Sequence, residues 1–347
     1  MIHVTYENVH NQFKLNGFQL DKEDLCRVAY SFIKEGEDFE KPVGNFLLDW
    51  FDAKSYIEMQ TSGSTGVPKI IRVDKQAMVN SALATGDFFE LHAGNKALQC
   101  LPVKYVAGKM MLIRSIILGL DLDYVAPSSH PMEGMDEKYD FVAMVPLQAQ
   151  NSLKELRNVK KLIVGGARIN SSLEKELMKL PTQVFETYGM TETITHIAAK
   201  RVGDKVFKVL PGVTISYDDR NCLVIHAPKI IAEETVVTND LVELVNENQF
   251  KFLGRIDNVI NSGGIKILPE QVEQKLDGKL DRRFFITSKE DSELGEKVVL
   301  VIEGEPFNVD STVFDSLDKY EHPKELIFVP KFKETENGKV IRKASWK

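Results

Sequence analysis

The chain has 347 residues, of which 43% are hydrophobic and 27% are charged, and its formal net charge is -7. This length allows a full hydrophobic core and two or three domains. The acidic balance argues against a protein whose main role is to bind a nucleic-acid backbone, because that affinity comes chiefly from clustered Lys and Arg. Cys26, Cys100 and Cys222 lie far apart with no C-x-x-C pair. The sequence therefore suggests neither a disulfide framework nor a zinc site.

The N-terminal residues lack both the basic and the apolar segment of a signal peptide. The most apolar run, residues 110–122, is interrupted by Arg114 and Asp121 and is too short to cross a membrane. We therefore expect a cytoplasmic protein without membrane insertion. The sequence does not decide between a monomer and a homo-oligomer.

In chain order, an amphipathic helix is expected over residues 20–33, and a loop rich in glycine and hydroxyl groups over residues 61–69. Helices and strands alternate after this loop. The expected helices are 75–89, 105–118, 146–156 and 172–180, and the expected strands are 97–101, 122–126, 141–145, 161–164 and 183–186. Strands that alternate with helices indicate parallel pairing.

Ligands of open α/β sheets bind beyond the carboxyl ends of the strands. Three candidate motifs follow predicted strands: residues 102–108, Gly165-Gly166-Ala167 and Tyr188-Gly189-Met190-Thr191-Glu192-Thr193. The pattern therefore predicts that these motifs share one edge of the sheet.

Beyond Lys200 the apolar period shortens towards two, which indicates a β-rich subdomain. Its expected strands are 222–226, 241–245 and 250–253, the last two joined as a hairpin. A boundary is expected at residues 254–257. It divides the chain into an N-terminal domain, residues 1–256, and a C-terminal domain, residues 257–347. The C-terminal domain is a small α+β unit with a helix that opens at Pro269 and strands at 284–287, 298–302 and 326–329.

The loop at residues 61–69 has the composition of a phosphate-binding loop. Its residues are Thr61, Ser62, Gly63, Ser64, Thr65, Gly66, Val67, Pro68 and Lys69. Glycines let backbone N–H groups approach an anion, hydroxyls add donors, and Lys69 adds positive charge. The spacing matches neither a Walker A motif nor a dinucleotide motif. A flexible Ser/Gly linker is the alternative, although linkers rarely place Pro-Lys beside an apolar pair such as Ile70-Ile71.

Residues 188–193 combine an aromatic face for a purine, a Thr191 hydroxyl and a Glu192 carboxylate that could ligate a hard cation. Together with the phosphate loop they suggest a magnesium nucleotide. The alternative is an ordinary strand-to-helix turn in which Thr191 is the N-cap. Asp240 could bind a ribose diol or end a strand, and Arg255 could bind the same nucleotide or a surface carboxylate.

Together these motifs resemble those of the adenylate-forming enzymes, which include acyl-CoA synthetases, luciferase and peptide-synthetase adenylation domains. Five motifs occur in the family's order: residues 61–69, 165–167, 188–193, Thr238-Asn239-Asp240 with Gly254-Arg255-Ile256-Asp257, and Gly338-Lys339. Within the family the chain is most similar to the o-succinylbenzoate–CoA ligases of menaquinone biosynthesis. That similarity lies in residues 188–193, in Ile260-Asn261-Ser262-Gly263-Gly264 and in the segment from Gly108 to Arg114.

The resemblance implies an ATP- and Mg²⁺-dependent acid–CoA ligase. It would form an acyl-adenylate with release of pyrophosphate and then the CoA thioester with release of AMP. The 61–69 loop would close over the β- and γ-phosphates, Tyr188 would pack on adenine, and Thr191 would contact the α-phosphate. Glu192 would ligate Mg²⁺. The remaining nucleotide-site residues implied are Gly165, Gly166, Ala167, Gly189, and Asp240 with Arg255 on the ribose hydroxyls.

The resemblance also implies a mobile C-terminal domain that turns about Asp257. Lys339 would bridge the carboxylate and the α-phosphate during adenylation, and the Gly263-Gly264 turn would line the CoA tunnel in the second step. The implied acid pocket contains Tyr105, Lys104, Lys109, Arg114, Thr195 and His196. A second carboxylate, as in o-succinylbenzoate, would need a cation or several donors there, because an unpaired buried charge is costly. For the two lysines, a solvated helix face is the alternative.

The chemistry is consistent with this mechanism. A carboxylate is a poor nucleophile towards an anionic phosphate, so Mg²⁺ and a lysine must neutralise charge, and orienting the bound reactants supplies up to ~7–11 kcal/mol of the barrier. No Ser-His-Asp triad is required, and His92, His130 and His226 are expected to be structural or substrate-contacting.

The sequence departs from the family pattern at Ile70, at Asn239 and at Tyr105, where relatives have glycine, glycine and histidine. It departs again at Lys333 and Glu334, ahead of Lys339, and the part before the glycine loop is short. Three alternatives stay open: a ligase for another aromatic or aliphatic acid, a stand-alone adenylation enzyme that loads a carrier protein, and a nucleotide-binding regulator without turnover.

Overall fold

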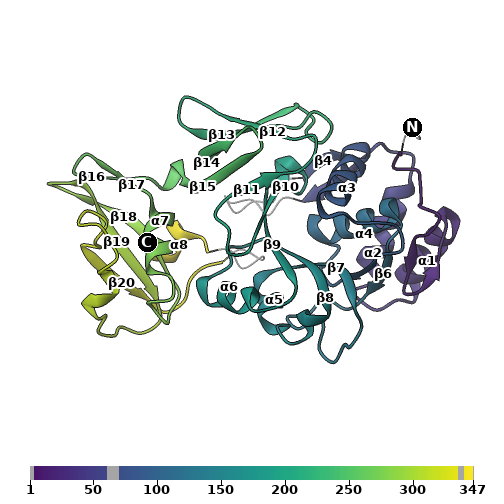
Figure 1. Cartoon of the computed structure of the whole chain (residues 1–347), viewed down its shortest axis with the longest axis horizontal. Helices are drawn as coiled ribbons and strands as arrows, with labels where there is room; N and C mark the ends of the chain where they lie inside the picture. Colours follow the sequence, from purple (N-terminus) through teal and green to yellow (C-terminus); the bar gives the residue numbers. More distant parts are fainter. Residues whose placement is uncertain (1–3, 61–69, 335–339, 347) are drawn as a thin grey trace.

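The computed structural model describes residues 4–60, 70–334 and 340–346, apart from the side chains of Gln60 and Lys343. Within these ranges the chain forms one large mixed sheet, a separate smaller sheet towards the C-terminus, and a two-stranded hairpin (Figure 1). The large sheet has the strand order β12-β13-β14-β15-β11-β10-β9-β8-β7-β5-β6-β1-β2. The mixed α/β fold class predicted from the sequence is confirmed.

The centre of the large sheet is parallel, as the alternation of helices and strands predicts. Its strands are β5 (Lys96–Gln99), β6 (Asp121–Tyr124), β7 (Tyr139–Met144), β8 (Val159–Val164) and β9 (Gln183–Gly189). Each of the four adjacent pairs in this group runs parallel. Their carboxyl ends therefore lie along one edge of the sheet.

Helices cover both faces of this parallel part. They are α3 (Lys75–Phe89), α4 (Val106–Leu118), α5 (Pro146–Asn151) and α6 (Ser171–Met178). Alternate strand residues enter two cores: Ala97 and Phe141 pack with α3 and α4, whereas Leu98 and Val142 pack with α5 and α6. The predicted helix over residues 146–156 is too long, because α5 ends at Asn151 and a 3₁₀ turn, η1 (Glu155–Asn158), follows.

Helix α4 is buried on all sides, with every residue from Met110 to Ile117 shielded from solvent. Such a helix is apolar all round because it lies within the core of a large domain. This position accounts for the most apolar run of the sequence. In the described ranges, no helix has the length and apolar character needed to cross a membrane.

The N-terminal part covers the far edge of the sheet. Its elements are β1 (Lys14–Leu15), β2 (Phe18–Gln19), α1 (Lys22–Lys34) and α2 (Lys41–Phe51). Helix α1, predicted from its amphipathic pattern, starts with a reciprocal capping box between Asp21 and Asp24. Helix α2 was not predicted. It buries Phe46, Leu47 and Trp50 in the main core.

The hairpin frames the glycine-rich loop. Strands β3 (Tyr56–Gln60) and β4 (Ile70–Asp74) pair antiparallel, with Gln60 opposite Ile70. Residues 61–69 thus connect two hydrogen-bonded strands. The loop itself, including Lys69, lies outside the described residues.

The rest of the large sheet is antiparallel, which matches the predicted change to a period of two. Its strands are β10 (His196–Arg201), β11 (Phe207–Val209), β12 (Thr214–Tyr217), β13 (Cys222–His226), β14 (Thr235–Asn246) and β15 (Gln249–Arg255). The predicted hairpin is present: β14 and β15 pair antiparallel and bring Asp240 opposite Arg255. A 3₁₀ turn, η2 (Thr191–Thr193), joins β9 to β10.

The C-terminal residues form a second sheet with cores of its own. Its elements are β16 (Ile260–Ser262), β17 (Ile265–Ile267), α7 (Pro269–Leu276), β18 (Phe284–Asp291), β19 (Gly295–Glu303), β20 (Glu325–Val329) and α8 (Arg342–Trp346), with 3₁₀ turns η3 (Ile256–Asn258) and η4 (Ser311–Phe314). Figure 1 shows this unit beside the large sheet. The turn η3 lies between β15 of the large sheet and β16 of this unit. Arg342 fixes α8 to the unit through an ion pair of 2.7 Å with Glu273.

Candidate active site

The structure brings the predicted motifs to the carboxyl edge of the parallel strands. Residues 102–108 follow β5, Gly165 to Ala167 follow β8, and Tyr188 and Gly189 end β9. Two glycines are required by close packing here. A Cβ added at Gly189 would lie 2.3 Å from the Thr195 carbonyl oxygen, and one at Gly108 would lie 2.4 Å from the Pro102 carbonyl oxygen. Backbone segments therefore approach one another closely at this edge.

Tyr188, Asp240 and Arg255 form one polar cluster across β9, β14 and β15. The Tyr188 hydroxyl donates to Asp240 Oδ2 at 2.5 Å, and Arg255 Nε lies 3.7 Å from Asp240 Oδ1. Burial, followed by the nearby Asp240 carboxylate, raises the pKa of Tyr188 far above its usual value, so its hydroxyl stays a donor. The Tyr188 ring packs edge-on against Phe250, with ring centres 5.2 Å apart.

Asp257 extends this cluster towards the C-terminal sheet. Arg255 Nη2 donates to Asp257 Oδ2 at 2.9 Å, and the Asn239 side-chain amide lies 3.2 Å from both carboxylate oxygens. Arg220 in turn donates to Asn239 Oδ1 at 3.1 Å. Asn239 stands where the family pattern has glycine, and glycine has no side chain that could contact Asp257 or Arg220.

A second polar cluster, formed by Arg114, Thr195, His196 and Thr85, is buried between α3, α4 and β10. Arg114 is only 2% exposed; its Nη2 donates to Thr195 Oγ1 at 3.2 Å and lies 3.4 Å from His196 Nδ1. Arg114 Nε is buried without a partner, and no carboxylate of the described residues forms an ion pair with this side chain. Burial lowers the pKa of Arg114 to about 9. A cation that is buried without a counter-charge is costly unless a ligand supplies one.

His196 contributes a neutral ring to this second cluster. It is 6% exposed, and burial, together with the adjacent Arg114 cation, holds its pKa well below the usual value. Thr85 on α3 lies 3.3 Å from His196 Nε2. Sequence reasoning missed Thr85, because a lone threonine within an apolar helix gives no signal of a site.

The two lysines proposed for the acid pocket are not brought together with Arg114. Lys109 Nζ donates to the carbonyl oxygens of Val103 at 2.8 Å and Lys104 at 3.2 Å, and it lies 5.4 Å from the centre of the Phe46 ring. Lys104 is exposed, and its ammonium lies 5.6 Å from the centre of the Tyr105 ring. Arg114 is therefore the cation that the structure buries beside Thr195 and His196.

Glu192 is exposed in the turn η2, next to Thr191. Among the described residues, no group of three or more His, Cys, Asp or Glu side chains could hold a metal ion. Lys339, like the 61–69 loop, lies outside the described residues.

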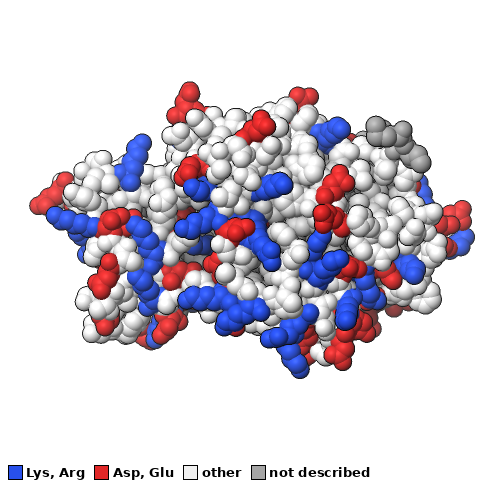
Figure 2. Space-filling view, viewed as in Figure 1, with Lys and Arg blue, Asp and Glu red and all other residues white. Residues whose placement is uncertain are grey.

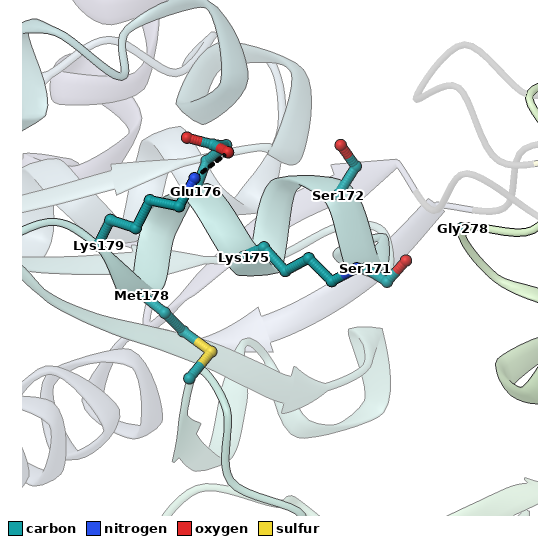
Figure 3. A pocket seen from close by; sticks show the side chains of 7 residues that line it. All are labelled: Ser171, Ser172, Lys175, Glu176, Met178, Lys179 and Gly278. Carbon is teal, nitrogen blue, oxygen red and sulfur yellow. Dashed lines mark hydrogen bonds and ion pairs between the residues drawn. The ribbon is translucent and has the colours of Figure 1, made fainter.

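The C-terminal unit contacts the large domain at the start of α6. The Ser171 amide donates to Asp277 Oδ2 at 2.8 Å, and Gly278 lies beside it in a hollow of about 450 Å³. Figure 3 shows this hollow, where Lys179 pairs with Glu176 on α6 at 2.6 Å. Of the predicted site residues that the structure describes, none lines it. The hollow therefore lies between α6 and the segment that follows α7.

Charge is unevenly distributed over the surface. On the face shown in Figure 2, Lys and Arg side chains gather around a recess in the middle of the view, where Figure 1 places the meeting of the C-terminal sheet and the large domain. The protein as a whole carries a net charge of -7. A local concentration of cations on an acidic protein favours a small anionic ligand at that place.

Comparison with known proteins identifies the family. The family model described as AMP-binding enzyme matches residues 52–220. A crystal structure of an acyl-CoA synthetase (AMP-forming)/AMP-acid ligase II-like protein from Dyadobacter fermentans is 34% identical, with a TM-score of 0.63, and the match covers 92% of this chain and 97% of that one. The chain belongs to the AMP-binding enzymes, in the group of AMP-forming acid–CoA ligases.

More distant members of the family are similar over most of the chain. The 2-succinylbenzoate–CoA ligase of Salmonella typhimurium is 27% identical over 329 residues, which cover 88% of this chain and 71% of that ligase. O-succinylbenzoate coenzyme A synthetase from Bacillus subtilis, solved with ATP and magnesium ion, is 20% identical with a TM-score of 0.73; the match covers 83% of this chain and 69% of that one. The latter similarity shows the shared fold.

Proposed function

We propose that this AMP-binding enzyme activates o-succinylbenzoate with ATP and transfers the acyl group to CoA. The observation that supports this substrate is the buried Arg114, whose Nε has no partner and whose charge is balanced by no carboxylate of the described residues. o-Succinylbenzoate has two carboxylates, of which only one reacts. The second would pair with Arg114, because a charge-assisted contact removes the cost of the unpaired buried cation.

In this proposal the residues at the sheet edge bind the nucleotide. Tyr188 packs against adenine, Asp240 and Arg255 hold the ribose hydroxyls, and Thr191 contacts the α-phosphate. The loop at residues 61–69 closes over the β- and γ-phosphates, with Gly165, Gly166, Ala167 and Gly189 allowing close approach. Mg²⁺ bound at Glu192 would offset the negative charge of the phosphates.

Catalysis in this proposal depends on orientation and charge. Thr195 and His196 help to position the acid, and Lys339 bridges its reacting carboxylate and the α-phosphate. The carboxylate oxygen then attacks the α-phosphorus and pyrophosphate leaves. In the second half-reaction the CoA thiol attacks the acyl carbon and AMP leaves. Holding two reactants in line contributes up to ~7–11 kcal/mol without a covalent enzyme intermediate.

The two half-reactions would use two positions of the C-terminal domain, residues 257–347. Asp257 would be the hinge, because it lies in η3 between the two sheets and its side chain contacts Arg255 and Asn239 of the large domain. The turn at Gly263 and Gly264 would line the CoA tunnel after the movement. Both glycines have positive φ, +57° and +81°, a tight turn that favours glycine.

The test compares acids and one arginine variant. Wild-type enzyme should release AMP in a CoA-dependent manner with o-succinylbenzoate and only weakly with benzoate or a medium-chain fatty acid. Arg114→Met should lower kcat/KM for o-succinylbenzoate by about 10- to 100-fold, the cost of losing a hydrogen bond to a charged group, and leave benzoate unaffected. Lys109→Met is the matched control from the same helix.

Equal rates with o-succinylbenzoate and a fatty acid would contradict the proposal. Mass spectrometry of the products separates the other readings: an adenylate without a CoA thioester indicates loading of a carrier protein, and no pyrophosphate exchange with any acid indicates a nucleotide-binding regulator.

A further inference from the structure

The second polar cluster contains a line of hydrogen bonds from α3 to Arg114. Thr85 is fully buried, and its hydroxyl donates to the Ser81 carbonyl oxygen at 2.9 Å. Thr85 Oγ1 also lies 3.3 Å from His196 Nε2, and His196 Nδ1 lies 3.4 Å from Arg114 Nη2. Thr85 on α3, His196 on β10 and Arg114 on α4 thus contact one another in that order.

The donors and acceptors in this line can be assigned from chemistry. A guanidinium only donates, so the nitrogen that faces Arg114, His196 Nδ1, must present its lone pair. The neutral ring then carries its proton on Nε2, which faces Thr85 Oγ1. Because the Thr85 hydroxyl hydrogen is directed to the Ser81 carbonyl, the Thr85 oxygen accepts from Nε2. Thr195 Oγ1, 3.5 Å from Nδ1, is compatible with the same tautomer because its hydroxyl can donate.

The protonation state of His196 agrees with this assignment. A charged imidazole would place an N–H on Nδ1, facing the N–H groups of Arg114. Burial and the Arg114 charge both lower the pKa of His196, so the ring is neutral at physiological pH.

We propose that Thr85 is a positioning residue for acid recognition: its hydroxyl oxygen accepts from Nε2–H and holds the His196 ring in place, and His196 thereby orients the Arg114 guanidinium towards the acid. With one Nη2 hydrogen directed to His196 and another to Thr195, Nε keeps a free donor for a carboxylate. This inference rests on the proposed role of Arg114 in binding the second carboxylate.

Thr85 contacts His196, whereas in the described part of the chain Ser115, a comparable hydroxyl on the neighbouring helix, does not. Ser115 on α4 is also fully buried, and its hydroxyl also donates to the carbonyl oxygen four residues earlier, Met111, at 2.9 Å. No hydrogen bond links Ser115 to His196 among those of the described residues. Ser115 is therefore a matched control for the loss of a buried hydroxyl that bonds its own helix.

The direct test is the tautomer itself. In ¹⁵N NMR spectra of wild-type enzyme, the His196 ring should show a protonated Nε2 and an unprotonated Nδ1, identified by loss of the signals in His196→Gln. In Thr85→Val, which keeps the shape but removes the acceptor, Nε2 should stay protonated because Nδ1 still faces Arg114, but its N–H signal should shift because the hydrogen bond is lost. Ser115→Ala should leave the spectrum unchanged. A wild-type ring protonated on Nδ1 would overturn the proposal without any variant.

Kinetics provide the second readout. Thr85→Val should raise KM for o-succinylbenzoate by about 2- to 10-fold, the range for loss of one neutral hydrogen bond, with kcat and KM for ATP nearly unchanged. Thr85→Ser should restore the wild-type values, and Ser115→Ala should not change them. If Arg114→Met loses selectivity for the diacid while Thr85→Val keeps the wild-type KM and an unshifted Nε2–H signal, the role of Thr85 is wrong and the proposed function stands. If Arg114→Met keeps that selectivity, Arg114 does not bind the second carboxylate, whereas the NMR spectra still report on Thr85 and His196.

Discussion

Two arginines at the candidate site occupy opposite electrostatic environments. Arg255 is partly exposed and contacts two carboxylates, Asp240 and Asp257, whereas Arg114 is buried and contacts none among the described residues. A cation that the chain already neutralises can help to shape a site for neutral groups such as hydroxyls. A cation that the chain leaves unpaired is suited to an anion brought from outside. In the proposed function, this contrast separates a nucleotide subsite at Arg255 from an acid subsite at Arg114.

The largest effect is expected for Arg114→Met, which should raise stability and lower activity. Arg114→Met should stabilise the ligand-free protein by about 1–3 kcal/mol, because it removes an unpaired buried charge, while activity on o-succinylbenzoate falls. Arg255→Met should not stabilise the protein, because it removes the cation beside the Asp240 carboxylate, which is only 8% exposed. Urea unfolding of both variants without ligand measures this difference. If Arg114→Met lowers the free energy of unfolding more than Arg255→Met does, the Arg114 charge is already compensated within the fold.

The paired cluster can be examined through Asp240. Asp240→Asn should raise KM for ATP by about 10-fold or more, because charge-assisted hydrogen bonds to the ribose hydroxyls are lost. The wild-type enzyme should discriminate against 3′-deoxy-ATP, and the variant should not. KM for the acid should stay unchanged. An Asp240→Asn enzyme that still discriminates between the two nucleotides would remove Asp240 from the ribose site.

The neutral state of His196 gives the buried cluster a pH dependence. Its pKa is lower in the folded protein than in the unfolded chain, so the unfolded state binds the additional proton first as the pH falls below about 6.5. Unfolding is therefore favoured on acidification, by up to about 1.4 kcal/mol per pH unit, until the folded pKa is reached. His196→Gln should remove this part of the slope in urea unfolding between pH 7 and pH 5. His226→Gln, at an exposed histidine, is the control and should keep the slope.

The sequence predicted the parts of the fold that follow from local pattern. The amphipathic helix α1, the boundaries of α3 and the parallel strands β5 to β9 are confirmed, because hydrophobic period and helix caps are encoded locally. Helix α2 was missed although Pro42 lies in its first turn, because its apolar segment is short and no side chain caps its N-terminus. The predicted helix at 146–156 was too long, because the chain tightens into a 3₁₀ turn after Asn151.

The candidate site was predictable only where its residues form contiguous motifs. Tyr188, Asp240 and Arg255 were found from such motifs, although their mutual contacts depend on pairing between distant strands. The sequence predicted both Lys109 and Arg114 for the acid pocket, as cations on one helix, and gave no reason to prefer either. Tertiary packing decides between them: it directs Lys109 to backbone carbonyls and leaves Arg114 Nε without a partner. The contribution of Thr85 depends on the approach of α3 to β10, which no local pattern encodes.

The smallest effect is expected at Asn239, which ties the paired cluster to Asp257. Asn239→Ala removes the amide that lies 3.2 Å from both Asp257 oxygens. Because this contact is exposed, the free energy of unfolding should change by less than about 1 kcal/mol. If Asp257 is the hinge, freeing its side chain should still change the ratio of the two half-reaction rates, which pyrophosphate exchange and thioester formation from supplied acyl-adenylate measure separately. Asn246→Ala, in the same strand and bonded to Gln249, is the matched control. An equal effect of both substitutions on that ratio would mean that Asn239 acts through the stability of β14 and not through the hinge.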